Sequence, residues 1–132
     1  MGLTVLDAGV LIALLDANDG HHAASIGALQ RCRERADDFV LPMSAYAEIL
    51  VAPSRGGLKA VAIVDGFVDA LPAVVEPITR PIAARAAALR AQSPTLRLPD
   101  ALVLATALVL RADRLLTTDR RWPDVGAGVE VV

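Results

Sequence analysis

Four acidic residues are the side chains of this sequence with the clearest chemical potential: Asp7, Glu48, Asp100 and Asp119. Each has an ordinary explanation when it is taken alone. Asp7 and Asp100 precede runs that suit helices, so either could be a simple helix cap. Glu48 could be a solvated helix residue, and Asp119 could be a turn residue. The alternative is that the four acids meet at one site and act together.

A shared site would need a positive charge among the carboxylates. Two carboxylates about 5 Å apart repel by roughly 3 kcal/mol at an effective dielectric constant near 20. Several such pairs would rival the whole stability of a small domain, about 5–15 kcal/mol. Oxygen ligands without a cluster of His or Cys favour Mg²⁺ or Mn²⁺ over zinc. A magnesium ion held by a few carboxylates keeps bound water, and that water can attack a phosphate.

Three hydroxyl groups lie close to these acids in the sequence. We expect Ser44 to cap the helix that carries Glu48, and secondarily to support that acid. Thr117 or Thr118 could donate a hydrogen bond to an acid or a phosphate, or could merely pack in the turn.

Three arginines also stand beside the acids: Arg97, Arg120 and Arg121. They could bind phosphate groups, or they could form ordinary ion pairs at the surface. Trp122 follows them directly, and we expect it to fill the core beneath the last loop.

The elements that must position these residues follow from the alternation of short apolar runs with helix-compatible runs. We expect strands at residues 4–6, 39–41, 74–76, 114–117 and 129–132. We expect helices at residues 8–15, 22–35, 44–51, 58–71, 78–91 and 101–111, with Pro53 preventing extension of the third. This alternation predicts a three-layer αβα, Rossmann-like fold with about five parallel strands. In such sheets ligands bind beyond the carboxyl ends of the strands, where Asp7 and Asp119 are expected.

Length and composition limit the function further. A chain of 132 residues is expected to form a single domain. Its hydrophobic fraction of 55% and mean hydropathy of +0.50 predict an apolar surface buried against a partner or a second copy. A net charge of -2 provides no overall attraction for nucleic acid, so phosphate binding must come from local arginines or a metal ion. Aromatic residues make up only 3%, which argues against aromatic stacking platforms.

We expect a cytoplasmic protein without a membrane segment. No basic region precedes the first apolar run, as a signal peptide would require. The longest apolar segment, residues 101–110, is about half of a membrane span. The single cysteine, Cys32, cannot form an internal disulfide and is compatible with a reducing compartment.

Four stretches of this sequence together resemble a PIN domain, specifically a VapC-type toxin ribonuclease. They are VLD at 5–7, SAYAEI at 44–49, LPDALVLATA at 98–107 and LLTTDRRW at 115–122. The resemblance covers almost the whole chain and implies that residues 1–132 form a single PIN domain. It implies a Mg²⁺-dependent endoribonuclease with the four acids as its catalytic and metal-binding residues, and Arg97 and Arg120 as candidate RNA contacts. It also implies inhibition by a cognate VapB-type antitoxin, a homodimer, and contact with DNA only through the antitoxin.

One departure from the family pattern stands beside the first acid. The family often carries Ser, Thr or Asn just after that Asp, whereas Ala8 and Gly9 follow Asp7 here. A hydrogen-bonding group near the metal is therefore absent from this position, which predicts weaker activity or metal affinity.

Other readings fit less well. A haloacid-dehalogenase-type phosphatase would need a second Asp where Gly9 stands, and a receiver domain would need a late lysine, whereas the only lysine is Lys59. No glycine-rich dinucleotide or nucleotide-binding pattern is present. The alternative kept open is a catalytically inactive PIN-like module that binds RNA or protein. Retention of all four acids argues against it.

Overall fold

A five-stranded parallel sheet forms the centre of the computed structural model, which describes residues 1–132. The strands are β1 (Leu3–Leu6), β2 (Asp38–Pro42), β3 (Val74–Glu76), β4 (Arg114–Thr117) and β5 (Val129–Val131). The helices are α1 (Ala8–Leu15), α2 (His22–Glu34), α3 (Met43–Gly56), α4 (Leu58–Ala70), α5 (Arg80–Gln92) and α6 (Leu98–Val109). The strand order is β3-β2-β1-β4-β5, and every neighbouring pair is parallel. The predicted three-layer α/β fold with five parallel strands is confirmed.

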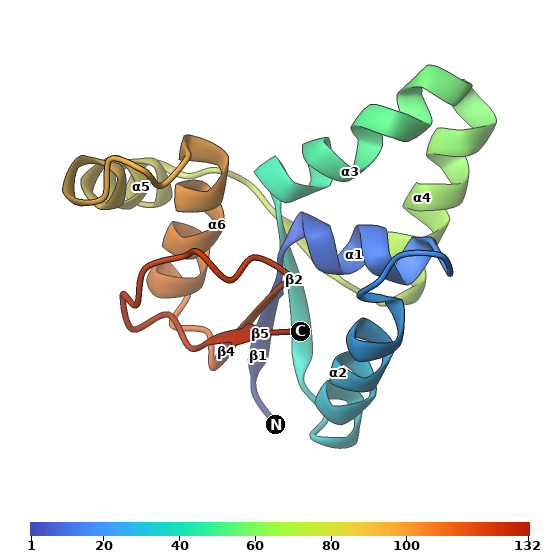
Figure 1. Cartoon of the computed structure of the whole chain (residues 1–132), viewed down its shortest axis with the longest axis horizontal. Helices are drawn as coiled ribbons and strands as arrows, with labels where there is room; N and C mark the ends of the chain where they lie inside the picture. The colour runs from blue at the N-terminus through green and yellow to red at the C-terminus, as the bar shows by residue number, and fades with distance from the viewer.

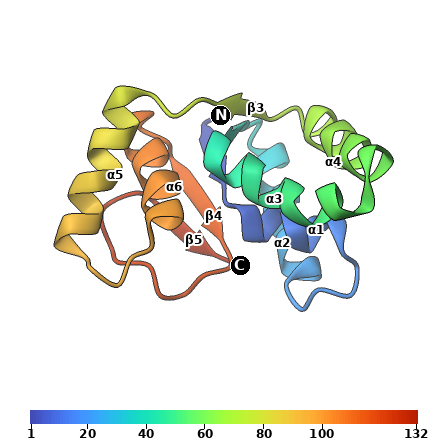
Figure 2. The same cartoon turned by 90° about the horizontal axis from the view of Figure 1, so that it is seen from above.

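Helices cover both faces of this sheet (Figure 1). Helices α5 and α6 lie on one side, α1 and α2 lie on the other, and the view from above shows the same separation (Figure 2). Helices α3 and α4 form a hairpin that projects from the carboxyl edge of the sheet beside α1. This hairpin leaves part of its apolar surface exposed, and Leu58 and Ile63 are 90% and 70% accessible.

The central strand explains where the core lies. Val5 on β1 pairs with Val40 on β2 and with Leu115 on β4. Val5, Leu6 and Leu115 have no accessible surface, as expected for strands covered by helices on both faces. Because all five strands run in one direction, the residues that follow β1 and β4 emerge at the same edge.

Two expectations for α3 are wrong. Pro53 does not end this helix, which continues to Gly56 and stops where Gly57 adopts a φ of 100°. Packing against α1, α4 and α6 provides contacts that offset the backbone hydrogen bond lost at the proline. Ser44 does not cap the helix, because the capping position is Pro42 and the Ser44 Oγ is buried without a hydrogen-bond partner.

The helix that carries Asp100 also begins earlier than expected. Helix α6 starts at Leu98, with Pro99 in its first turn and Asp100 one residue further in. Pro is well tolerated at this point because the first N–H groups of a helix have no partner within it. No helix of this chain has the length and apolar character needed to cross a membrane.

Candidate active site

Asp7 lies at the carboxyl end of β1 and occupies the N-cap position of α1. Its backbone N–H donates to the Leu116 carbonyl at 3.0 Å, which continues the pairing of β1 with β4. Its carboxylate makes no capping hydrogen bond to α1 and instead accepts one from Thr117 Oγ1 at 2.8 Å. The simple helix-cap explanation therefore does not describe this buried acid.

Thr117 links two of the acids. Its hydroxyl donates to Asp7 Oδ2 and accepts a hydrogen bond from the Asp119 backbone N–H at 3.1 Å. The side chain has no accessible surface, so this arrangement is fixed by the packing of β4. The expectation that a threonine here donates to an acid is confirmed for Thr117.

Asp100 and Asp119 each pair with an arginine from their own segment. Arg97 Nε lies 3.7 Å from Asp100 Oδ2, across one turn of α6. Arg121 holds Asp119 with two guanidinium nitrogens, Nε to Oδ1 at 3.2 Å and Nη2 to Oδ2 at 3.1 Å. Both arginines are exposed, so these pairs are open to solvent and to competing ions.

The charges of these acids act on one another. Burial raises the pKa of Asp7 to about 6, with further contributions from the Asp100 and Glu48 charges, against the lowering effect of the Thr117 hydrogen bond. Burial also raises the pKa of Asp100, with Arg97 opposing and Asp119 reinforcing this shift. The Arg121 hydrogen bonds hold the pKa of Asp119 below its usual range. The Asp7 carboxyl therefore experiences the charges of Asp100 and Glu48, and the Asp100 carboxyl experiences that of Asp119.

These acids do not form a ready-made cation cage. No three of them converge closely enough to hold a metal ion in the observed side-chain arrangement. Asp100 and Asp119 line one hollow, while Glu48 is exposed at the edge of another. The donor set is nevertheless all oxygen, as Mg²⁺ prefers. Burial, with smaller contributions from the Asp100 and Glu48 charges, raises the pKa of Asp7, and a nearby cation would favour its charged form. The residues fit a divalent ion chemically, while a shared ion remains a prediction.

Thr118 occupies the space beside Gly9. A Cβ placed on Gly9 would collide with Thr118 Oγ1, whereas the Thr118 Cβ would remain at an ordinary 3.6 Å. Because Gly9 has no side chain, the Thr118 hydroxyl, from the loop after β4, fits beside it. No hydrogen bond of Thr118 accompanies this contact, so its predicted role toward an acid or phosphate is not established.

Trp122 partly fulfils the predicted core role. Its side chain packs against the core, but the residue also lines the hollow beside Asp100 and Asp119. Its buried Nε1 lies near both carboxylates without reaching standard hydrogen-bond geometry. In the sequence, Trp122 stands three residues after Asp119, which could have indicated a place beside that acid. We predicted only core packing for it.

Two hollows flank Asp119 and share Arg121. One, of about 260 Å³, contains Arg97, Asp100 and Trp122. The other, of about 460 Å³, is lined entirely by polar residues and contains Thr118 and Arg120. Of the predicted RNA contacts, Arg97 thus lies in the first hollow, paired with Asp100, and Arg120 lies in the second.

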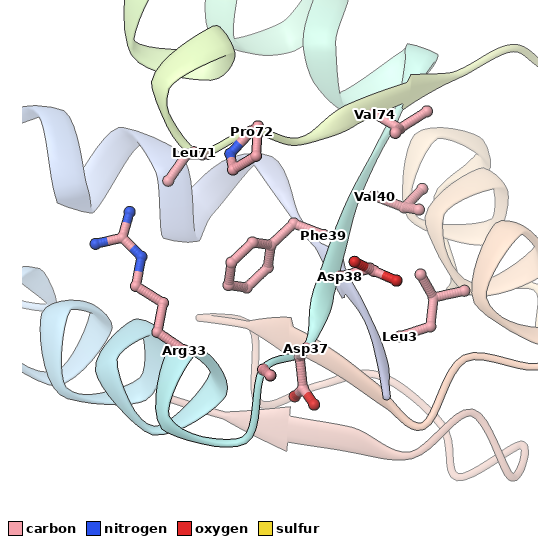
Figure 3. A pocket seen from close by; sticks show the side chains of 10 residues that line it. Leu3, Arg33, Asp37, Asp38, Phe39, Val40, Leu71, Pro72 and Val74 are labelled. Carbon is pink, nitrogen blue, oxygen red and sulfur yellow. The ribbon is translucent and has the colours of Figure 1, made fainter. Parts of the chain in front are cut away.

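A larger hollow of about 620 Å³ lies at the opposite, amino edge of the sheet (Figure 3). Phe39 on β2 points into it, between Arg33 and the turn containing Leu71 and Pro72. Its buried acid, Asp37, is held by Thr4 at 3.1 Å and paired with Arg35 and Arg114. These contacts connect the starts of β1, β2 and β4 through Asp37 Oδ2, while the buried Oδ1 has no hydrogen-bond partner.

Comparison with known families identifies the class of this protein. Residues 4–128 match the PIN domain model, and the chain therefore belongs to the PIN domain family. Comparison with curated protein sequences finds no match.

Solved structures with the same fold include chains of toxin–antitoxin systems. A chain of a toxin–antitoxin complex from Klebsiella pneumoniae is 25% identical, with a TM-score of 0.73 over 97% of this chain and 96% of that chain. A chain of VapBC2 from Rickettsia felis, bound to a DNA fragment from its promoter, is 12% identical, with a TM-score of 0.79 and 98% of both chains covered. Mycobacterium tuberculosis VapC20, described as a sarcin–ricin loop cleaving toxin, is 16% identical, with a TM-score of 0.71 over 89% and 91%.

Proposed function

We propose that this PIN domain is a VapC-type toxin, a metal-dependent endoribonuclease that cleaves a phosphodiester bond of cellular RNA. The observation that carries the proposal is the buried Asp7 carboxylate at the end of β1, held by Thr117, whose hydroxyl also accepts from the backbone of Asp119. The likeness to the Klebsiella toxin–antitoxin chain and to a toxin that cleaves the sarcin–ricin loop supports the same class.

Asp7, Asp100 and Asp119 would hold Mg²⁺, or Mn²⁺, and Glu48 would complete or orient the site. When bound, the ion supplies an activated water and neutralises charge developing on the phosphate. Thr117 keeps the Asp7 carboxylate directed toward the site through its hydrogen bond of 2.8 Å. In-line attack by water would leave a 5′-phosphate and a 3′-hydroxyl.

The arginines have a second part in this proposal. Arg97 and Arg121 neutralise Asp100 and Asp119 in the metal-free protein. Both guanidinium groups are exposed and can contact RNA phosphates even when paired, and a cation that competes for the carboxylates would leave them freer to do so. Metal and RNA would in this way strengthen each other's binding.

A cognate VapB-type antitoxin is the proposed protein partner. An apolar groove of about 310 Å³ lies between α1, α3 and α4, lined by Ile12, Ile49 and Ile63, with Glu48 at its edge. An antitoxin helix could lay its apolar face there and direct an arginine toward the acids. The Rickettsia neighbour was solved with promoter DNA, and we propose that any DNA contact of this chain is made through its antitoxin. The remaining apolar surface suits a homodimer, and we propose a cytoplasmic location.

RNA cleavage tests this function against the alternative of an inactive binding module. Purified protein should cleave cellular RNA with Mg²⁺, should not cleave it with EDTA, and should lose activity as Asp7→Asn or Asp100→Asn. Sequencing of the cleaved ends should show 5′-phosphates. A 2′,3′-cyclic phosphate would contradict attack by water, and binding without cleavage in every condition would favour the inactive module.

A further inference from the structure

The hollow beside Asp100 and Asp119 has features that holding a cation would not require. Two of its walls are apolar, formed by Leu96 and the single tryptophan of the chain, Trp122. Arg97 and Arg121 stand at its rim with 69% and 86% of their side chains exposed. Its volume of about 260 Å³ leaves room for a small planar group.

The position of Trp122 suits contact with such a group. Its Nε1 is buried and lies near the Asp100 and Asp119 carboxylates, which line the same hollow. Trp122 is half-buried and lines the hollow together with Asp100 and Asp119. An aromatic surface of this kind stacks favourably on nucleobases of any sequence.

The second hollow, on the other side of Asp119, continues the same surface. It contains His21, Arg120 and Arg121 and no hydrophobic residue. Cationic groups therefore lie on both sides of the acids, while the apolar wall lies on one side only. A single RNA strand that crossed the acids would meet a polar surface for its backbone on one side, and on the other a hollow in which Leu96 and Trp122 offer apolar contact for a base.

We infer that the hollow formed by Leu96, Arg97, Arg121 and Trp122 is a nucleobase subsite for the nucleotide adjacent to the cleaved phosphate. The base would lie against the indole, and the two guanidinium groups would bind the flanking phosphates. This inference rests on the proposed ribonuclease function for its substrate, and it adds that the RNA must be single-stranded at this nucleotide. Unstacked bases are the usual targets of aromatic side chains in RNA recognition.

The fluorescence of the single tryptophan tests the subsite directly. The probes are pentauridylate, pentaadenylate and an abasic ribose-phosphate pentamer of equal charge, each titrated in EDTA so that no cleavage occurs. We expect both base-containing pentamers to quench Trp122 emission to saturation and the abasic pentamer to leave it unchanged. Equal responses to all three pentamers, or no response to any, would overturn the subsite.

Fluorescence anisotropy with labelled pentamers measures the contributions of base contacts and phosphate contacts separately. We expect Trp122→Leu to weaken pentauridylate binding at least fivefold and to leave abasic binding within twofold. Arg97→Gln should weaken both probes, because it removes a phosphate contact. Arg55→Gln, at the far end of α3, is the matched control and should change neither. A Trp122→Leu protein that remains folded by circular dichroism and binds pentauridylate like the wild type would contradict the inference.

The cleavage assay keeps this inference separate from the function on which it rests. Base-dependent quenching in a protein that never cleaves RNA with Mg²⁺ would retain the subsite and refute the ribonuclease. Cleavage of RNA without base-dependent quenching would retain the ribonuclease and refute the subsite.

Discussion

The Thr117 hydroxyl donates to the Asp7 carboxylate at 2.8 Å, and both side chains are buried where β1 and β4 end. The same hydroxyl accepts from the Asp119 backbone, so one β4 residue connects two acids that are 112 positions apart in the chain (119 minus 7). This contact fixes the direction of Asp7 before any ion or substrate is present. Its removal should therefore affect both stability and the acid itself.

Thr117→Val removes this hydroxyl while keeping the shape of the side chain. We expect the free energy of unfolding to fall by about 2 kcal/mol, because a buried carboxylate loses a hydrogen bond. Urea unfolding at pH 7.5 measures the change, and Thr117→Ser is the control that should retain most of the stability. A fully stable Thr117→Val protein would show that the contact contributes nothing to the fold.

Asp7 should make the metal-free protein less stable as pH rises. Its pKa is 3.8 ordinarily and about 6 in the folded chain, so the unfolded chain ionises more easily. The stability that the neutral Asp7 carboxyl contributes is fully present below pH 3.8 and is lost as the pH rises through about 6. This pKa shift corresponds to a loss of at most about 3 kcal/mol in the free energy of unfolding at neutral pH.

Asp7→Asn should consequently raise the melting temperature of the metal-free protein at pH 7.5 and have little effect near pH 4. Asn retains an oxygen that can accept the Thr117 hydrogen bond. Asp100→Asn should act in the same direction but less strongly, because Arg97 and Arg121 already offset its charge. Thermal unfolding in EDTA across this pH range measures both variants. A destabilised Asp7→Asn protein at pH 7.5 would mean that the charged carboxylate is required by the fold.

Arg121 should compete with cations for Asp119. Arg121→Gln removes the guanidinium group from both carboxylate oxygens and leaves only the backbone N–H of residue 121 on Oδ1. We therefore expect Mn²⁺ affinity to rise severalfold in the absence of RNA. The same substitution should weaken RNA binding in EDTA, because a phosphate contact is lost. Calorimetry with Mn²⁺ and anisotropy with labelled RNA provide the two readouts, with Arg55→Gln as the control. We therefore expect Mn²⁺ affinity to rise and RNA affinity to fall. A fall in Mn²⁺ affinity would contradict competition between Arg121 and the cation.

Gly9 should tolerate a side chain only when Thr118 is shortened. Gly9→Ala alone should destabilise the protein by about 1 kcal/mol or more, since its Cβ meets Thr118 Oγ1. In a Thr118→Ala background the same change should be neutral or stabilising, because Ala favours a helix over Gly. A double-mutant cycle by urea unfolding measures the coupling, and additive effects would show that the collision is relieved by simple side-chain rotation.

The parallel sheet and its common edge could be predicted because they depend on local patterns. Short apolar runs such as 4–6 and 114–117 specify buried parallel strands, and such strands end at one edge. The limits of α3 could not be predicted, because Pro53 is tolerated only through packing with distant helices. Ser44 resembles a cap in sequence, but Pro42 takes the capping position.

The identity of the candidate acids could be predicted, but their present partners could not. Arg97 and Arg121 were visible as neighbours of Asp100 and Asp119, and whether they pair with the acids or bind phosphate depends on side-chain conformation. The direction in which Trp122 faces likewise depends on the path of the last loop. Such features are set by tertiary contacts that periodicity does not record.

Titration of the metal-free protein with Mn²⁺ by calorimetry at pH 7.5 tests most directly whether Asp7, Asp100 and Asp119 act as one cation site. We expect saturable binding in the wild type and at least a tenfold loss of affinity in each of Asp7→Asn, Asp100→Asn and Asp119→Asn. Asp38→Asn, an exposed acid at the opposite edge of the sheet, should bind like the wild type. Absence of binding, or binding that survives all three substitutions, would contradict the account.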